Sequence, residues 1–333
     1  MIRLADLACI FLLVRTRDDL WKYTLIMALG VLLSQGYLWL YLRRFVGWYR
    51  PRGREMARHL RAELLLFIPV IAVSIYKMMD KVMLGWMSTI TQVGYYESVE
   101  KIINIPLGVI TALGTVMLPR MSNLAAKGQT KKSRRYIYDS MRFAMLLATG
   151  MCFGLAGIAQ DLIPLFLGEE YLPCILLLQT MAPTVLFIAW ANVIRTQYLI
   201  PNRLDRSYII SVTLGAVLNL AVNLLLIPRL DALGAVIGTL CAEGSVCLCQ
   251  TLMVRRQLDV KRYARVTLPF LLPGAGMFLL VRLIGRRMSG PAALVLEITA
   301  GAAAYLAVTG AYLLAIHGPA AARLARKVKR KGK

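Results

Sequence analysis

Histidine and acidic side chains are scarce in this sequence. Its 333 residues include two histidines, and 17 Asp plus Glu stand against 40 Lys plus Arg, which gives a formal net charge of +23. His59 and His317 both flank apolar segments. A zinc site needs several nitrogen or sulfur ligands and a catalytic triad needs a buried histidine, so the sequence predicts neither.

Paired cysteines and the common nucleotide-binding and catalytic motifs are also missing. The six cysteines lie inside apolar segments without C-x-x-C spacing, and we interpret them as small buried hydrophobic residues. The sequence has no G-x-x-x-x-G-K-[ST], no G-x-S-x-G and no H-E-x-x-H. We therefore predict no metal, no cofactor and no catalytic residue, and a protein that is not an enzyme.

Apolar residues are what the sequence has in excess. They make up 58% of the chain, with a mean hydropathy of +0.62, whereas soluble proteins contain roughly 45–50%. A soluble protein cannot bury this fraction and also carry so much unbalanced charge, so the composition excludes a cytosolic enzyme, a secreted disulfide-bonded module and a disordered basic tail. Nucleic acid is not expected as a partner either, because the basic charge should follow the membrane surface.

Ten apolar segments predict an all-α polytopic membrane protein with about ten transmembrane helices. A helix needs about 20 residues to cross roughly 30 Å of hydrocarbon, and the first segment is short by that measure. The segments are Leu4–Val14, Trp21–Leu42, Ala62–Trp86, Ile102–Leu118, Met141–Pro164, Leu172–Ile194, Tyr208–Ile227, Ala232–Val254, Val266–Ile284 and Pro291–Ile316.

The charge of the loops predicts the orientation of these helices. Thirty of the 40 basic residues lie in the two termini and in every second loop between the apolar segments. Eight lie in the remaining loops. Cytoplasmic loops carry the excess of Lys and Arg, so both termini are predicted to be cytoplasmic. The polar segment 43–61 is predicted to be an amphipathic linker along the inner surface, drawn to anionic lipid, or else a plain connecting helix.

The third apolar segment carries Lys77, Asp80 and Lys81. Their i, i+3 and i, i+4 spacing places them on one helical face, where Asp80 can neutralise one lysine. Charges at membrane depth are costly and therefore mark functional candidates. One interpretation is a cationic patch that contacts an anionic substrate, with Asp80 available for proton coupling. The other is a set of side chains that extend to the outer interface.

Two asparagines and one glutamate form a second group of polar candidates within apolar segments. Asn219 and Asn223 share one helical face, and Glu243 lies near the middle of its segment. The small residues around Glu243 predict close helix packing. Its carboxyl serves either transport and proton coupling or a structural polar contact.

A third group of charged residues lies at the ends of the fourth apolar segment. Glu97, Glu100 and Lys101 cluster at its start, and Glu97 and Lys101 are predicted to form an i, i+4 ion pair. Arg120 lies at the other end. These four residues are candidates for a gate, and the alternative is a solvated helix start with an arginine that anchors the orientation.

Two stretches resemble a known family. Leu64–Ser122 reads LLLFIPVIAVSIYKMMDKVMLGWMSTITQVGYYESVEKIINIPLGVITALGTVMLPRMS, and Leu218–Glu243 reads LNLAVNLLLIPRLDALGAVIGTLCAE. The first resembles the start of the C-terminal half of bacterial oligosaccharide flippases. These are the Wzx-like polysaccharide biosynthesis transporters of the multidrug/oligosaccharidyl-lipid/polysaccharide exporter superfamily. The second resembles a later motif of that family, which related exporters share.

The resemblance implies a fold of two six-helix lobes around a central cavity, often with two further helices. This chain would hold the C-terminal lobe in 62–254, with 1–42 as the remnant of an N-terminal lobe that lacks its first four helices. Residues 43–61 would link the two parts, and 255–333 would be two additional helices with a basic cytoplasmic tail.

The resemblance implies a flippase in the bacterial cytoplasmic membrane. It would translocate a polyprenyl-diphosphate-linked oligosaccharide for surface polysaccharides such as O-antigen, by ion-coupled alternating access, with membrane lipids and polysaccharide polymerase machinery as further partners. The roles this assigns are substrate binding for Lys77, Lys81, Asn219 and Asn223, and ion coupling or charge tuning for Asp80 and Glu243.

Three alternatives to a flippase remain. A multidrug or cation exporter of the same superfamily would prefer acidic residues in its cavity. A membrane-embedded glycan polymerase or ligase would need a long outer loop with catalytic residues, which this sequence does not offer. A non-transporting remnant is the third alternative.

Overall fold

The computed structural model describes residues 2–14, 16, 19–42, 45–47, 53, 56, 57, 60, 64, 67, 78–288 and 290–331. Within these residues the regular structure is helical, so the predicted all-α fold is confirmed. The chain divides into two compact units, Met1–Leu65 and Leu66–Lys333, and each is described by itself.

The first unit contains α1 (Ile2–Leu13) and α2 (Leu20–Leu42), which pack against each other. Asp6 of α1 points at Gly30 of α2, where any side chain would collide with the carboxylate. α2 contains the predicted span Trp21–Leu42. α1 has 12 residues and is too short to cross hydrocarbon alone.

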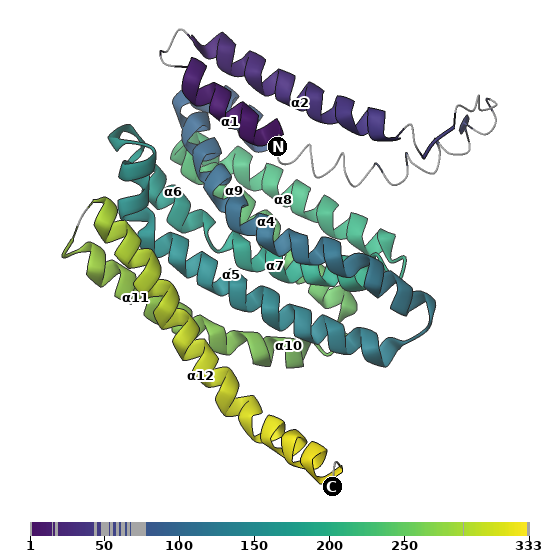
Figure 1. Ribbon diagram of the computed structural model, residues 1–333. Coiled ribbons are helices and arrows are strands. Elements are labelled where there is room, and N and C mark those ends of the chain that lie inside the picture. Colours follow the sequence, from purple (N-terminus) through teal and green to yellow (C-terminus); the bar gives the residue numbers. More distant parts are fainter. Residues whose placement is uncertain are drawn as a thin grey trace. The chain divides into compact units, whose positions relative to one another are not determined.

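The second unit is a bundle of long helices, coloured from blue to yellow in Figure 1. Its first described element is the helical stretch 78–87. A π-helical turn, η3 (Arg195–Leu199), extends α7. The α-helices that follow 78–87 are α4 (Ile90–Ala126), α5 (Thr130–Phe166), α6 (Cys174–Met181), α7 (Thr184–Ile194), α8 (Asp205–Leu230), α9 (Ala232–Val254), α10 (Val260–Thr267), α11 (Leu271–Gly285) and α12 (Pro291–Lys331).

Eight stretches of the described chain are long and apolar enough to span a membrane. They correspond to eight of the ten predicted segments. Most of the third predicted segment, Ala62–Trp86, lies outside the described residues, as does most of the predicted linker 43–61. α4 and α5 each have 37 residues, longer than predicted, because their polar ends continue the helices beyond the apolar segments.

The hairpin of α8 and α9 is the most closely packed part of the second unit. A methyl group built at Gly234 would lie 2.6 Å from the backbone carbon of Leu226, and one at Gly238 would overlap Oδ1 of Asn223. Small residues let membrane helices approach this closely, as the pattern around Glu243 predicts. The hairpin therefore brings the polar faces of α8 and α9 into direct contact.

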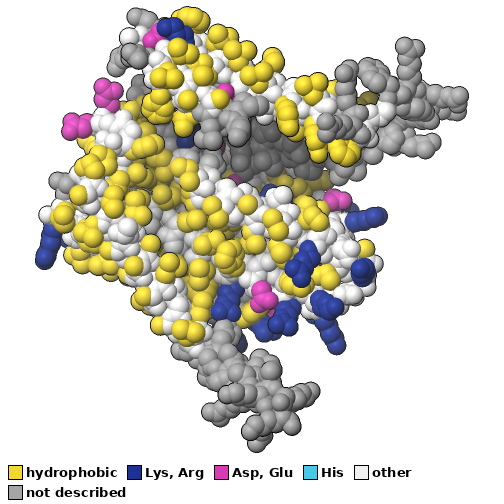
Figure 2. All heavy atoms as spheres, viewed as in Figure 1, with side chains coloured by type: hydrophobic (Ala, Val, Ile, Leu, Met, Phe, Trp, Pro, Cys, Tyr) yellow, Lys and Arg dark blue, Asp and Glu magenta, His cyan; other side chains and the backbone are white. Residues whose placement is uncertain are grey.

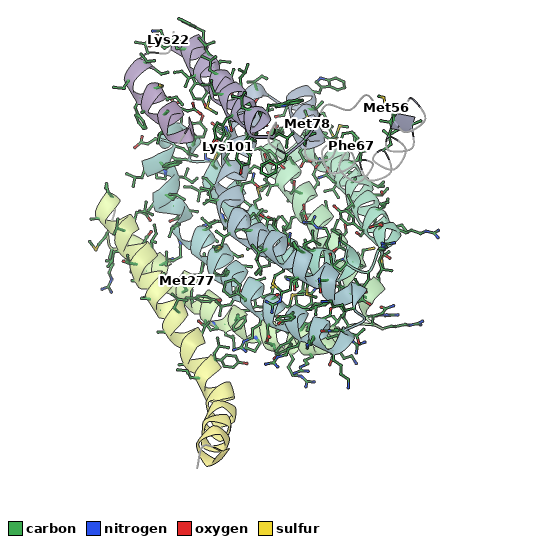
Figure 3. All side chains as sticks on the ribbon, turned by 45° about the vertical axis from the view of Figure 1, so that its right-hand side comes forward. Lys22, Met56, Phe67, Met78, Lys101 and Met277 are labelled. Atoms are coloured by element: carbon green, nitrogen blue, oxygen red, sulfur yellow. The ribbon has the colours of Figure 1, made fainter. Side chains whose placement is uncertain are left out.

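α11 and α12 pack along α5 on another side of the unit. Tyr305 of α12 donates a hydrogen bond of 2.7 Å to the carbonyl of Leu146 on α5. Met277 of α11, labelled in Figure 3, joins Ile158 and Val281 in a small buried apolar cluster between these helices. α11 and α12 are therefore anchored to α5.

The surface of the second unit agrees with a membrane environment. Figure 2 shows hydrophobic side chains over the helix faces, and Lys and Arg side chains gathered near the α4–α5 turn and α10. Exposed hydrophobic residues such as Ile105 and Val116 of α4 would be costly in water and are favourable in lipid. The chain is a multi-pass membrane protein with a basic end.

Gly234 offers a test of the close helix contact. We expect Gly234→Ala to lower the stability of the protein by roughly 1–3 kcal/mol, because the new methyl group meets backbone that cannot move aside easily. Gly276→Ala on α11 is the control, since a methyl group there meets nothing within 4 Å. Thermal unfolding of both purified variants in detergent checks this, and equal melting temperatures would contradict the packing described above.

Candidate functional site

Asp80 is the centre of a buried polar cluster between the stretch 78–87, α4, α8 and α9. The residue is 1% exposed. Its Oδ1 accepts a hydrogen bond of 2.6 Å from Nδ2 of Asn223. Its Oδ2 accepts hydrogen bonds from the hydroxyls of Tyr96 at 2.8 Å and Thr239 at 2.9 Å. Each surrounding helix therefore contributes one donor to this carboxylate.

Asn219 and Asn223 lie one turn apart on α8 and belong to the same cluster, which we call the Asp80 cluster (Asp80, Tyr96, Asn219, Asn223 and Thr239). Nδ2 of Asn223 is 3.3 Å from Oδ1 of Asn219, and both residues are buried. Oδ1 of Asn223 has no hydrogen-bond donor within the described part of the chain. Amide and hydroxyl groups thus surround the carboxylate, and the amide oxygen of Asn223 packs against Gly238.

Near the Asp80 cluster, hydrogen bonds connect the start of α4 to the α8–α9 turn. The hydroxyl of Ser88 donates a 2.6 Å hydrogen bond to Oδ1 of Asp231 in the α8–α9 turn. The backbone N–H of Ala232 donates to Oε1 of Gln92 at 3.4 Å. These two bonds fix the start of α4 against the hairpin, so the Tyr96 hydroxyl, one turn further along α4, can reach Asp80.

Lys81 does not share the environment of Asp80. Its ammonium pairs with Glu100 of α4 at 2.8 Å, and its side chain is 33% exposed. The predicted neutralisation of a lysine by Asp80 is therefore wrong for Lys81, because Glu100 is the ion-pair partner of this lysine. Lys77 lies outside the described residues. Substrate binding by these lysines stays a prediction.

The other charged candidates on α4 lie at its two ends. The predicted pair of Glu97 and Lys101 is confirmed at 3.2 Å, with both side chains substantially exposed. Lys101 is labelled in Figure 3. Arg120 donates a hydrogen bond to the Tyr136 hydroxyl and stacks on that ring, with 4.2 Å from its guanidinium carbon to the ring centroid. A gating role for these residues stays a prediction.

A cavity of about 280 Å³ opens between α4, α7, α8 and α9. Glu243, one of the predicted candidates, lies on its wall and is 9% exposed. Most of the other polar groups in the wall are uncharged and can exchange hydrogen bonds with hydroxyl-rich ligands. The polar lining residues are Asn104, Thr111, Asn192, Arg195, Tyr208, Glu243 and Gln250.

Arg195 is the cationic residue in the wall of this cavity. It begins the π-helical turn that extends α7, and such turns are frequent at functional sites. Its guanidinium carbon lies 5.7 Å from the centroid of the Tyr208 ring. Gln250 is held by a 3.1 Å hydrogen bond to the Ser211 hydroxyl. The wall thus combines a positioned cation with amide and carboxyl groups.

The Asp80 cluster and the cavity follow each other along the same helix faces. On α9, Thr239 of the cluster and Glu243 of the cavity are four residues apart, which is one helical turn. On α8, Asn219 and Val212 are two turns apart. A shift or rotation of α8 or α9 at one site must therefore move the wall of the other.

Several cavity residues were not among the sequence candidates. Arg195 directly follows the predicted segment Leu172–Ile194, whereas the helix continues through it to Leu199. Asn104, Asn192 and Gln250 are isolated polar residues in apolar segments. Helical spacing could have flagged each of them as inward-facing, but not which helices they would meet.

Comparison with known proteins supports the resemblance seen in the sequence. Residues 2–125 match the family model described as "Polysaccharide biosynthesis protein". The "Probable low-salt glycan biosynthesis flippase Agl15" of Haloferax volcanii is 26% identical over 175 residues, which are 49% of this chain and 34% of that protein. The "Putative O-antigen transporter" of Shigella dysenteriae is 24% identical over 253 residues, 74% of this chain and 62% of that protein.

A solved structure shows the same fold. The lipid II flippase MurJ in an inward closed conformation superposes with a TM-score of 0.72 at 13% sequence identity, covering 90% of this chain and 64% of that one. The resemblance to polysaccharide biosynthesis flippases is therefore confirmed. The chain spans about a third of the Haloferax relative and less than two thirds of the Shigella relative.

The contribution of the Tyr96 hydroxyl to the Asp80 cluster can be measured directly. We expect Tyr96→Phe to lower stability by roughly 1–3 kcal/mol, because a buried carboxylate loses a donor that water cannot replace. The neighbouring Tyr95→Phe is the control, since the Tyr95 hydroxyl bonds to an exposed carbonyl, that of Glu170. Thermal unfolding in detergent compares the two, and a loss as large in Tyr95→Phe would contradict the central place of the cluster.

Proposed function

We propose that this protein acts in flipping a polyprenyl-diphosphate-linked oligosaccharide across the bacterial cytoplasmic membrane for surface polysaccharide synthesis, with both termini cytoplasmic. Its relatives are named as a glycan biosynthesis flippase and an O-antigen transporter, which supports this substrate class. The excess of Lys and Arg at one set of helix ends supports the orientation.

The observation that carries the proposal is a hydrogen-bonding cavity inside a bundle whose outer faces are apolar. A sugar–diphosphate headgroup must cross hydrocarbon without losing its hydrogen bonds, since each unsatisfied polar group costs several kcal/mol there. Three asparagine or glutamine side chains and Arg195 line the cavity. At about 280 Å³ it accommodates one part of the headgroup, such as the diphosphate or one sugar ring.

Arg195 is the group that we assign to the diphosphate. Its guanidinium offers the planar fork of donors that pairs with phosphate oxygens, while Tyr208 limits its orientations. The amide side chains of Asn104, Asn192 and Gln250 then face the sugar part. This arrangement separates charge recognition from sugar recognition within one cavity.

Arg195→Ala is expected to weaken binding of a fluorescent polyprenyl-diphosphate-linked oligosaccharide by about ten- to a hundredfold, the effect of losing a charged hydrogen bond worth roughly 1.5–3 kcal/mol. Arg195→Lys keeps the charge and should lose less. Binding is measured by fluorescence anisotropy on the purified chain in nanodiscs. Arg206→Ala, at an exposed arginine near the start of α8, is the control. Unchanged affinity in Arg195→Ala would reject this role.

Ion coupling is proposed to act at the Asp80 cluster. An anionic carboxylate surrounded by neutral groups binds a proton or a small cation, and its hydroxyl and amide oxygens are the ligands that hard cations prefer. Binding there draws the stretch 78–87, α4, α8 and α9 together, and these last three helices also form the cavity wall. An ion bound at the Asp80 cluster can therefore shift the equilibrium between two conformations of the cavity.

Asp80→Asn tests this coupling because it keeps the shape of the side chain and removes the charge. In proteoliposomes, flipping by the unmodified chain should accelerate under an imposed proton or sodium gradient, and the gradient that works identifies the ion. Asp80→Asn should not respond to either gradient, whereas Asp205→Asn at the exposed start of α8 should respond fully. A full response by Asp80→Asn would place the coupling elsewhere.

Glu243 in the cavity wall favours one second candidate, an exporter of organic cations. A carboxylate in a partly apolar cavity attracts a lipophilic cation. Binding of tetraphenylphosphonium to the same nanodisc sample separates the two functions. Tight binding that is lost in Glu243→Gln, together with no binding of the lipid-linked oligosaccharide, would favour the exporter.

A further inference from the structure

A third polar cluster lies between α5, α11 and α12, apart from the Asp80 cluster and the cavity. It consists of Asp161 on α5, Arg282 on α11 and Glu297 on α12. Glu297 is 1% exposed, although its neighbours along α12 are apolar. Its Oε2 has no hydrogen-bond partner within the described part of the chain. A buried acid in such surroundings requires a ligand or a neutralising partner.

Gly285 shows how closely the two carboxyl groups approach each other. A methyl group built on its backbone would overlap Oε1 of Glu297 and lie 2.8 Å from Oδ2 of Asp161. Both oxygens therefore lie close to the same point above the Gly285 α-carbon, so the carboxyl groups of Asp161 and Glu297 are neighbours. Two ionised carboxylates this close repel each other and can only accept hydrogen bonds, whereas a proton on one of them removes the repulsion.

The charges around the two acids also favour one bound proton for the two carboxyl groups. Arg282 lies three residues before Gly285 on the same face of α11, whereas Arg286 and Arg287 at the end of α11 are exposed. Residues 291–304 of α12 contain no ionisable side chain other than Glu297. With both acids ionised, the cluster carries one net negative charge in apolar surroundings, whereas one shared proton makes it neutral.

We propose that Asp161 and Glu297 form a proton-binding site that holds one proton between them at neutral pH. The singly protonated pair and Arg282 together are neutral, and this neutral cluster keeps α12 and α11 attached to α5. Loss of the proton sets two negative charges against each other across the α5–α12 contact and loosens α12. The site does not depend on the flippase function and is read out on the resting protein.

Infrared spectroscopy of the full chain in nanodiscs detects the shared proton as a carboxylic acid band at neutral pH. We expect this band to be weakened in Glu297→Gln and in Asp161→Asn, and unchanged in Glu170→Gln, an exposed glutamate of an outer turn. Measuring all variants in an Asp80→Asn background removes any contribution of Asp80 to the band. If one of the two cluster variants does not fold, the other carries the test.

The pH dependence of stability gives an independent readout. A folded state that holds a proton more tightly than the unfolded chain loses stability as the pH rises. The melting temperature of the unmodified chain should therefore fall as the pH rises from the ordinary carboxyl range, about pH 4–5, through neutral pH, and should level off once the proton is lost. Glu297→Gln should flatten this slope relative to Glu170→Gln. An acid band and a pH slope that are both unchanged in Glu297→Gln and Asp161→Asn would overturn the proposal.

Discussion

The second unit depends on supplying hydrogen-bond donors to one carboxylate, that of Asp80, inside the helix bundle. An isolated carboxylate at this depth would cost at least a few kcal/mol, so Asp80 has to be surrounded by donors or neutralised. Asn223, Tyr96 and Thr239 supply those donors from three different helices. Because the requirement is met only when α4, α8 and α9 are in register, the charge specifies how these helices pack.

The same requirement explains why small residues recur along the α8–α9 hairpin. Asn223 can reach Asp80 only because Gly238 leaves room for its amide oxygen, and the hairpin closes only because Gly234 accepts the backbone near Leu226. This close approach also fixes the cavity wall one turn further along α9, at Glu243. The cavity is thus a consequence of how the Asp80 cluster is packed.

Much of the fold could be predicted from the sequence, because the lipid environment imposes a simple length and hydrophobicity rule on each helix. The predicted segments Trp21–Leu42 and Ala232–Val254 coincide, residue for residue, with two stretches of the structure that are long and apolar enough to span a membrane. The site was less predictable. Spacing placed Asn219 beside Asn223, but the ion pair of Lys81 depends on a neighbour, Glu100, that competes with Asp80 for the lysine.

Arg195 and Asp161 illustrate why the remaining polar contacts could not be found. Each lies near the end of a helix, where a charged side chain is ordinarily interpreted as an anchor at the membrane surface. Arg195 enters the cavity wall because a π-helical turn continues α7 beyond the apolar segment, and Asp161 meets Glu297 because α12 returns along α5. The positions of both side chains depend on how distant parts of the backbone are arranged, which a local sequence pattern does not reveal.

The ionic functions proposed for the three buried acids follow from their three different surroundings. Asp80 is surrounded by neutral donors and favours a cation, whereas Glu243 shares a cavity with Arg195, where a zwitterionic wall favours a ligand with both charge and hydroxyl groups. Glu297 faces a second acid, which favours a proton alone. Since the first two lie on one pair of helices and the third lies across α5, ion binding at Asp80 can act on the cavity directly. A proton at Glu297 acts on the attachment of α12 instead.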